Sequence, residues 1–212
     1  MEKISRLHYI TTNATLAKRA CEAGVDWIQL RLKNMAYEEY KTIAKEVKGV
    51  CQQHNCKLII NDNVQLAFEI EADGVHVGKT DMAPEKARAL VGSQMIIGGT
   101  ANTYADIVRL CNAGVDYIGL GPYRFTKTKE NLSPILGLEG YQNIFQQIAK
   151  DNLTVPPIIA IGGIAIEDIP LLLQTGIYGV AISGAISNAD DVTKAATSCI
   201  KTISEHTQLQ AI

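Results

Sequence analysis

The stretch AGVDWIQL, residues 23–30, returns almost unchanged as AGVDYIGL at residues 113–120. In both copies a helical pattern ends at a glycine, and a short run of apolar residues follows. Glycine suits the left-handed backbone found at the C-terminal end of a helix. The apolar run suits a strand buried on both faces, as in a parallel sheet. Weaker copies at 72–77 and 176–182 indicate that this helix–turn–strand unit repeats along the chain.

Extending the pattern in both directions gives eight strands that alternate with eight amphipathic helices. We expect strands at residues 6–11, 25–31, 57–61, 74–77, 95–99, 115–120, 157–162 and 178–182. We expect helices at residues 13–23, 36–53, 63–70, 83–91, 103–113, 138–150, 166–175 and 188–205. Asn13 and Asp62 stand where the first and third helices should begin, and both residue types are common at helix starts.

Strict alternation of strand and helix predicts an α/β fold whose parallel strands are joined by right-handed crossovers. Eight units predict a single (β/α)₈ TIM barrel that uses residues 1–212 as one domain. A doubly wound sheet is the alternative that the same alternation allows. The longest stretch without periodicity, residues 121–137, is expected to be a functional loop.

The charges of the chain are almost balanced, since 20 basic and 22 acidic residues give a formal net charge of -2. This balance offers no basic surface for nucleic acid or an anionic membrane, and no apolar run reaches the roughly 18 residues of a membrane span. No signal peptide is visible, and five widely spaced cysteines favour reduced thiols. We expect a cytoplasmic protein with small-molecule substrates and without nucleic-acid or membrane partners. Homo-oligomer formation is left open.

Cys51, His54 and Cys56 lie close together in the sequence and are residue types that bind zinc. They fall at the polar end of a predicted helix and no second pair of ligands accompanies them, so a zinc site is not favoured. Cys21 and Cys111 lie in helical patterns, where we expect them to act as small buried apolar side chains.

In a barrel of this kind the active site lies where the strands end and the following loops begin. The second strand ends in QLRLK, and strand alternation places Gln29, Arg31 and Lys33 on one face. Two cations and an amide on one face favour an anionic, phosphate-bearing ligand. The alternative to a ligand site is that these three side chains simply face solvent at the end of the strand.

Two aspartates follow neighbouring strands: Asp62 follows the third and Asp81 the fourth. With the oxygens of a diphosphate they would form the oxygen shell that Mg²⁺ prefers. Each one alone is explained equally well as a helix N-cap, so it is the pairing that favours a metal site.

The segment GVHVGKT, residues 74–80, resembles a phosphate-binding P-loop, but it has three residues between its glycines where the motif needs four. We therefore reject a nucleotide hydrolase and interpret His76 as a packed core histidine. Thr100 lies in a small-residue turn that permits close approach to a ligand. Glycines after the seventh and eighth strands, near 162–163 and at 184, predict the phosphate site of barrel enzymes.

Six segments make the chain similar to the thiamine phosphate synthase family, whose members are single (β/α)₈ barrels. They are QLRLK at 29–33, IND at 60–62, GVHVGKTD at 74–81, TKTK at 126–129, IGGI at 161–164 and GVAISGAI at 179–186. Each segment is weak alone, but six in the same order are specific. The resemblance covers about residues 6 to 205.

The resemblance implies a transferase of thiamine biosynthesis that joins 4-amino-2-methyl-5-hydroxymethylpyrimidine diphosphate to 4-methyl-5-(2-hydroxyethyl)thiazole phosphate or its carboxylated form. It implies Mg²⁺ as cofactor, a pyrimidine carbocation as intermediate, and thiamine phosphate and pyrophosphate as products. The implied metal ligands are Asp62 and Asp81. The implied contacts of the pyrimidine diphosphate are Gln29, Arg31, Lys33, Asn61, Thr100 and Lys129. The implied contacts of the thiazole phosphate are Thr126, Lys127, Thr128, Gly163, Ser183 and Gly184.

Arg31, Lys33 and Lys129 are the implied catalytic residues, because they would neutralise the departing diphosphate. Thr100 and Gly184 depart from the family pattern, which usually has serine at each position. Two alternatives stay open: a related thiazole tautomerase, and a non-catalytic barrel that binds a phosphate ligand. The tautomerase should lack the metal carboxylates and the full 126–129 segment, and a sensor would leave both carboxylates unexplained.

Overall fold

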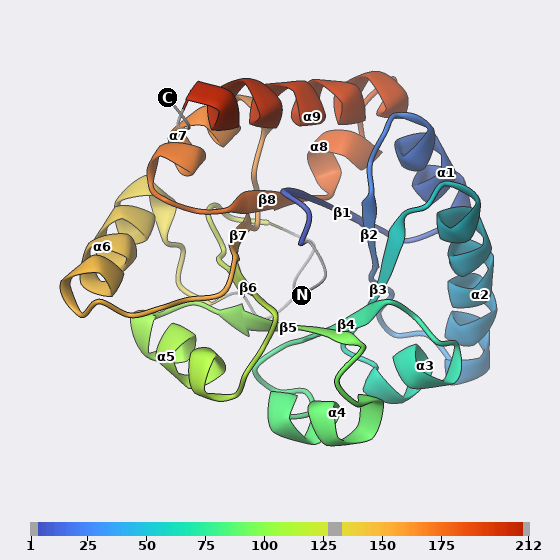
Figure 1. Cartoon of the computed structure of the whole chain (residues 1–212). Coiled ribbons are helices and arrows are strands. Elements are labelled where there is room, and N and C mark those ends of the chain that lie inside the picture. The colour runs from blue at the N-terminus through green and yellow to red at the C-terminus, as the bar shows by residue number, and fades with distance from the viewer. Residues whose placement is uncertain (1–3, 127–132, 210–212) are drawn as a thin grey trace.

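Eight parallel strands close into a barrel in the computed structural model, which describes residues 4–126 and 133–209 (Figure 1). The strands are β1 (Leu7–Thr11), β2 (Trp27–Leu30), β3 (Lys57–Asn61), β4 (Gly74–Val77), β5 (Ile96–Ala101), β6 (Tyr117–Leu120), β7 (Ile158–Ile161) and β8 (Gly179–Ile182). Each strand pairs in parallel with the next along the chain, and β8 pairs with β1, with Leu7 opposite Val180. The predicted (β/α)₈ barrel is confirmed, and the doubly wound sheet is wrong because such a sheet has two open edges.

The helices form an outer ring around the strands (Figure 1). They are α1 (Ala14–Glu22), α2 (Tyr37–Gln53), α3 (Val64–Glu69), α4 (Pro84–Val91), α5 (Tyr104–Asn112), α6 (Gly137–Lys150), α7 (Ile169–Gln174), α8 (Gly184–Ser187) and α9 (Val192–Leu209). A short 3-10 turn, η1 (Ile166–Asp168), precedes α7. The segment after β8 folds as two helices, where the sequence predicted one. None of the helices in the described part of the chain is long and apolar enough to span a membrane.

Helices end where one residue takes a left-handed backbone and turns the chain toward the next strand. Gly24 after α1 and Gly114 after α5 do so with φ of 96° and 68°, as the repeated stretch predicts. The weaker copy at 72–77 behaves differently. There Glu71 takes the left-handed conformation with φ of 52°, and Gly74 lies inside β4. The prediction that a glycine follows each helix is therefore wrong at this position.

Side chains of asparagine begin the first and third helices. Asn13 accepts a hydrogen bond from the backbone N–H of Leu16 at 2.9 Å, as expected for an N-cap. In the third helix Asn63 plays this part, accepting from Leu66 at 2.9 Å. The prediction that Asp62 starts this helix is wrong by one residue, which leaves the Asp62 carboxylate without a capping role.

Aromatic rings fill the inside of the barrel. The ring of His8 stacks on Trp27 with centroids 4.3 Å apart and meets the edge of Tyr117 at 5.0 Å. Gly98 on β5 leaves room for this layer, since a Cβ there would lie 2.2 Å from the Tyr117 ring. The larger apolar core lies between the strands and the surrounding helices.

His8 is buried in this layer, where its Nε2 lies 3.0 Å from the carbonyl oxygen of Ser5. Burial, helped by the nearby His76, lowers the pKa of His8 to about 3, against a smaller opposing effect of the Ser5 carbonyl. Because the folded pKa lies below the unfolded value, the unfolded chain binds the proton more tightly. The neutral ring therefore contributes fully to stability above about pH 6.5 and loses that contribution as pH falls toward 3.

We predict that His8→Phe flattens the pH dependence of stability. In the native chain His8 should add roughly 1.4 kcal/mol per pH unit to the slope of the unfolding free energy between about pH 6 and 4. Urea unfolding at pH 7.5, 6, 5 and 4.5 measures this slope, with His206→Phe on α9 as the matched control. Equal slopes in both variants would refute the assignment.

Candidate active site

A cavity of ≈ 720 Å³ opens at the ends of the barrel strands where the sequence placed the site. Every predicted site residue that the structure describes lines this cavity: Gln29, Arg31, Lys33, Asn61, Asp62, Asp81, Thr100, Thr126, Gly163, Ser183 and Gly184. The remaining predictions, Lys127, Thr128 and Lys129, lie outside the described residues. Residues more than 150 positions apart thus line one cavity, because the carboxyl ends of all the parallel strands lie at the same end of the barrel.

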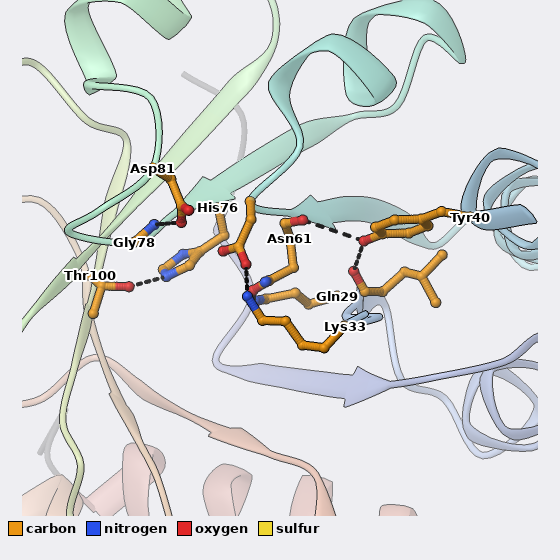
Figure 2. A network of polar contacts seen from close by, with 10 residues as sticks. Gln29, Lys33, Tyr40, Asn61, His76, Gly78, Asp81 and Thr100 are labelled. Atoms are coloured by element: carbon orange, nitrogen blue, oxygen red, sulfur yellow. Dashed lines mark hydrogen bonds and ion pairs between the residues drawn. The ribbon is translucent and has the colours of Figure 1, made fainter. Parts of the chain in front are cut away.

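An amide pair joins the ends of β2 and β3 (Figure 2). Gln29 Nε2 donates to Asn61 Oδ1 at 2.7 Å, and both side chains are buried. The hydroxyl of Tyr40 on α2 donates to the Leu30 carbonyl at 2.8 Å and lies 3.4 Å from that of Asn61. These bonds hold two adjacent strand ends in fixed positions and fix the orientation of both amides.

The two predicted metal carboxylates lie on adjacent loops and interact with each other. Burial disfavours ionisation of Asp62, but hydrogen bonds from Lys33 and from the Asp81 carboxyl outweigh it and lower the Asp62 pKa. Burial, followed by Asp62, raises the pKa of Asp81, although Asp81 also accepts the Gly78 N–H at 2.7 Å. Two carboxyl groups that lie this close together are well placed to share a cation, and carboxylate oxygen is the ligand that Mg²⁺ prefers.

Neither carboxylate serves as a helix N-cap, so the alternative explanation of these two aspartates as capping residues is wrong for both. Asn63 caps α3, and α4 begins at Pro84 after the N-cap residue Ala83, whose side chain makes no capping bond. Asp62 also has a left-handed backbone, with φ of 66°, and donates its N–H to the His76 carbonyl at 2.8 Å. Such strain in a non-glycine residue is typical of functional sites.

His76 is a cavity residue that the sequence interpretation missed. It is buried, as expected for a core histidine, yet it also lines the cavity. Its Nδ1 lies 3.0 Å from the Tyr117 hydroxyl. Its Nε2 lies 2.9 Å from Thr100 Oγ1 (Figure 2). The imidazole therefore links the aromatic layer to the cavity and positions Thr100. A polar residue between two valines in the stretch GVHVG was the available signal.

Two glycine turns form the opposite wall of the cavity. Gly162 and Gly163 follow β7 with φ of 97° and 67°. A Cβ on Gly163 would lie 2.9 Å from the carbonyl oxygen of Phe125, so glycine lets this turn pack against the loop after β6. Ser183 and Gly184 follow β8 and open α8, a short helix that the sequence did not predict. The first N–H groups of a helix have no partner within it and suit an anion.

An ion pair ties the loop after β6 to the turn after β7. Arg124 binds Asp168 through both guanidinium nitrogens, with Nη2 to Oδ1 at 2.5 Å. Asp168 Oδ2 also accepts the Ala165 N–H at 2.8 Å, and its side chain is almost fully buried. The sequence interpretation missed this pair, since nothing local links residues 44 positions apart.

A closed (β/α)₈ barrel with a charged cavity at its strand ends is the architecture of a barrel enzyme. A family model described as thiamine monophosphate synthase matches residues 4–186. A thiamine-phosphate synthase of Bacteroides thetaiotaomicron is 50% identical over 175 residues, which is 82% of this chain and 83% of that one. A thiamine-phosphate synthase of Flavobacterium johnsoniae is 47% identical over 193 residues, 88% of this chain and 91% of that one.

A solved structure agrees with these sequence matches. The thiamine phosphate pyrophosphorylase of Pyrococcus furiosus superposes with a TM-score of 0.83 at 28% identity, covering 95% of this chain and 96% of that one. The chain therefore belongs to the thiamine monophosphate synthase family.

We predict that Asp168→Asn destabilises the protein by about 1–3 kcal/mol, because the buried carboxylate loses its charge and one acceptor while the half-exposed Arg124 keeps its charge. The free energy of unfolding in urea measures the effect. Glu167→Gln is the matched control, since it removes one exposed charge from the neighbouring residue. Equal stability of the two variants would show that the ion pair does not hold these loops together.

Proposed function

We propose that the protein is a thiamine phosphate synthase, joining 4-amino-2-methyl-5-hydroxymethylpyrimidine diphosphate to 4-methyl-5-(2-hydroxyethyl)thiazole phosphate or its carboxylated form. The observation that carries the proposal is the single cavity that gathers a carboxylate pair, basic side chains and two glycine turns. Relatives of this name, matched over 83% and 91% of their length, support it. Highly charged substrates do not cross membranes unaided, so we place the reaction in the cytoplasm.

The wall formed by β2, β3 and β4 is the proposed site of the pyrimidine diphosphate. Arg31 and Lys33 supply positive charge for the diphosphate, and Lys129 is the further cation that the family resemblance implies. The amides of Gln29 and Asn61 offer donors and acceptors suited to an aminopyrimidine. Thr100, held by His76, adds a hydroxyl on the same side.

Asp62 and Asp81 are the proposed ligands of Mg²⁺. Their fit rests on two facing carboxyl groups that have no capping role and whose pKa values shift in opposite directions, Asp62 downward and Asp81 upward, with their mutual interaction among the causes. When bound, Mg²⁺ neutralises charge on the diphosphate and so favours its departure. Lys33 pairs with Asp62, which keeps an ammonium beside the position of that charge.

The glycine turns after β7 and β8 are the proposed site of the thiazole phosphate. Backbone N–H groups near Gly163 and Gly184 supply donors that need no side chain, as at other barrel phosphate sites. The hydroxyls of Ser183 and Thr126 line the same part of the cavity. Lys127 and Thr128 complete the set by family resemblance.

The proposed reaction needs charge neutralisation and exclusion of water. The pyrimidine C–O bond breaks and its electron pair leaves with the diphosphate, so a cation stabilised by the amino-pyrimidine remains. The thiazole nitrogen then donates its electron pair to that carbon and forms the new C–N bond. With the carboxylated thiazole, the carboxyl group leaves as CO₂ and the electrons of the broken C–C bond remain in the ring. Arg31, Lys33 and Lys129 would hold the departing negative charge. No acid/base dyad is required for this step, and the cations, amides and hydroxyls that line the cavity suit charge neutralisation.

The two alternative functions explain fewer of the observed contacts. A thiazole tautomerase gives no reason for the carboxylate pair or for Lys33 beside it. A non-catalytic phosphate sensor gives no reason for the strained backbone of Asp62, which aims the carboxylate at its partner. Both alternatives predict no thiamine phosphate from the purified protein.

We predict that Asp62→Asn and Asp81→Asn each lower the formation of thiamine phosphate by about 10²-fold or more, the scale on which loss of one charge-stabilising group acts. The assay uses both substrates and Mg²⁺, with Mn²⁺ binding followed by electron paramagnetic resonance. Both variants should bind Mn²⁺ more weakly. Asp190→Asn, an exposed aspartate outside the cavity, is the control. No product from the native protein, or full activity in both variants, would overturn the proposal.

We predict that substitutions at the proposed pyrimidine site and at the proposed thiazole site change the KM of different substrates. Gln29→Leu should raise the KM of the pyrimidine diphosphate while leaving that of the thiazole phosphate nearly unchanged. Ser183→Ala should do the reverse, and by less than about tenfold, because the backbone donors remain and one neutral hydrogen bond contributes about 1 kcal/mol. Steady-state kinetics with each substrate varied in turn measure the split. A rise in the KM of both substrates in either variant would contradict this division of the cavity.

A further inference from the structure

Three cysteine thiols meet at the end of the barrel opposite the cavity. Cys21 lies in the last turn of α1, Cys51 lies in the last turn of α2, and Cys56 immediately precedes β3. Their sulfur atoms all lie within 4.8 Å of one another, and the residues are only 6%, 1% and 6% exposed. None of the three lines the cavity, because the cluster adjoins the beginning of a strand and the cavity surrounds the strand ends.

The way α2 ends brings two of these thiols together. Asn55 takes the left-handed backbone with φ of 53°, and the N–H of Cys56 donates to the carbonyl of Cys51 at 2.9 Å. This Schellman motif places the two side chains in contact. Helix α1 packs against α2 (Figure 1). It supplies Cys21 as the third thiol. The sequence interpretation had grouped His54 with Cys51 and Cys56, whereas the structure puts Cys21 in that place.

The fold does not need sulfur at the end of α2. The same backbone motif ends α1, α3, α5 and α6, and there the two contacting positions hold aliphatic residues. These pairs are Ala20 and Val25, Ala67 and Ala72, Leu110 and Val115, and Ile148 and Leu153. An aliphatic pair thus satisfies the packing at four other helix ends, and the thiols at the α2 end call for a different explanation.

The spacing of the sulfur atoms matches a shared metal ion. With metal–sulfur bonds of about 2.3 Å, the sulfur atoms of a three-thiolate site lie about 4 Å apart. Thiolate is the form of cysteine that binds metals, and three sulfur atoms this close together can bind one ion between them.

The surroundings of the cluster limit the charge of its ligand. Lys57, which follows Cys56 in the chain, forms an ion pair with Asp73 at 3.0 Å, so their charges neutralise each other. A divalent ion on three thiolates leaves one net negative charge, whereas a monovalent ion leaves two. The lower charge is easier to bury, which favours a divalent, thiophilic ion of the zinc group.

We propose that Cys21, Cys51 and Cys56 form a thiolate site for Zn²⁺ or a chemically similar divalent ion. The ion joins the ends of α1 and α2 to the start of β3. One position of its tetrahedron is left for water, because no fourth His, Cys or carboxylate atom of the described residues lies in the cluster. Binding releases the thiol protons and cross-links segments about 30 residues apart.

The test uses the full chain with Cys111→Ala and Cys199→Ala, so that the cluster holds every remaining thiol. The reduced, metal-free protein is titrated with Cd²⁺ alone. We expect one equivalent to bind per chain, with the ultraviolet absorption of cadmium–thiolate bonds and a higher unfolding temperature. Competition with a chromophoric chelator then gives the affinity for Zn²⁺.

Single Cys21→Ser, Cys51→Ser and Cys56→Ser changes in this background are the matched variants. Each should weaken Cd²⁺ binding by at least about a hundredfold and remove the rise in unfolding temperature. Absence of the absorption band in the parent protein would overturn the proposal, and this result does not depend on whether the serine variants fold. An unchanged band in any folded serine variant would overturn it as well. The measurement does not involve thiamine chemistry, so its outcome is independent of the proposed function.

Discussion

The contact between Tyr117 and His76 connects the packing of the barrel with the chemistry of its cavity. Tyr117 fills the interior beside Trp27 and His8, and its hydroxyl lies 3.0 Å from His76. The other nitrogen of His76 holds Thr100 at the cavity wall. This chain of contacts requires Gly98, since a Cβ there would lie 2.2 Å from the tyrosine ring and 2.6 Å from His76 Nδ1. The packing of aromatic rings inside the barrel therefore sets the position of the Thr100 hydroxyl at the cavity wall.

The fold could be predicted from the sequence because its signals are local and repeated. Each unit states its own helix end and strand start, as in AGVDW and AGVDY, and closure follows from counting eight of them. The errors also have local causes. Asp62 and Asn63 are both good capping residues, and only the backbone decides between them. The helix predicted at 188–205 corresponds to α9, whereas α8, a single turn directly after β8, is too short to show an amphipathic period.

The positions of the site residues were predictable for a different reason. In a parallel barrel every strand end reaches the same mouth, so reading strand ends is enough to gather residues as distant as Gln29 and Ser183. This rule cannot predict which side chains contact one another across the cavity floor or between loops. The bond of His76 to Thr100 and the Arg124–Asp168 ion pair depend on three-dimensional distances. For the same reason the sequence did not indicate that Cys21 meets two cysteines 30 or more positions away.

Aspartates at the two ends of the barrel lie in opposite kinds of environment. At the beginning of the strands, Asp116 accepts the Ile97 N–H at 2.7 Å and an Arg88 hydrogen bond at 2.6 Å. Its charge is satisfied by the backbone of the neighbouring strand and by one arginine, which suits a stabilising role. At the other end Asp62 has strained backbone geometry and faces a second carboxyl group. Two facing carboxyl groups repel each other when both are ionised, and a cation between them would relieve that repulsion, so this pair fits the proposed binding role better than a stabilising one.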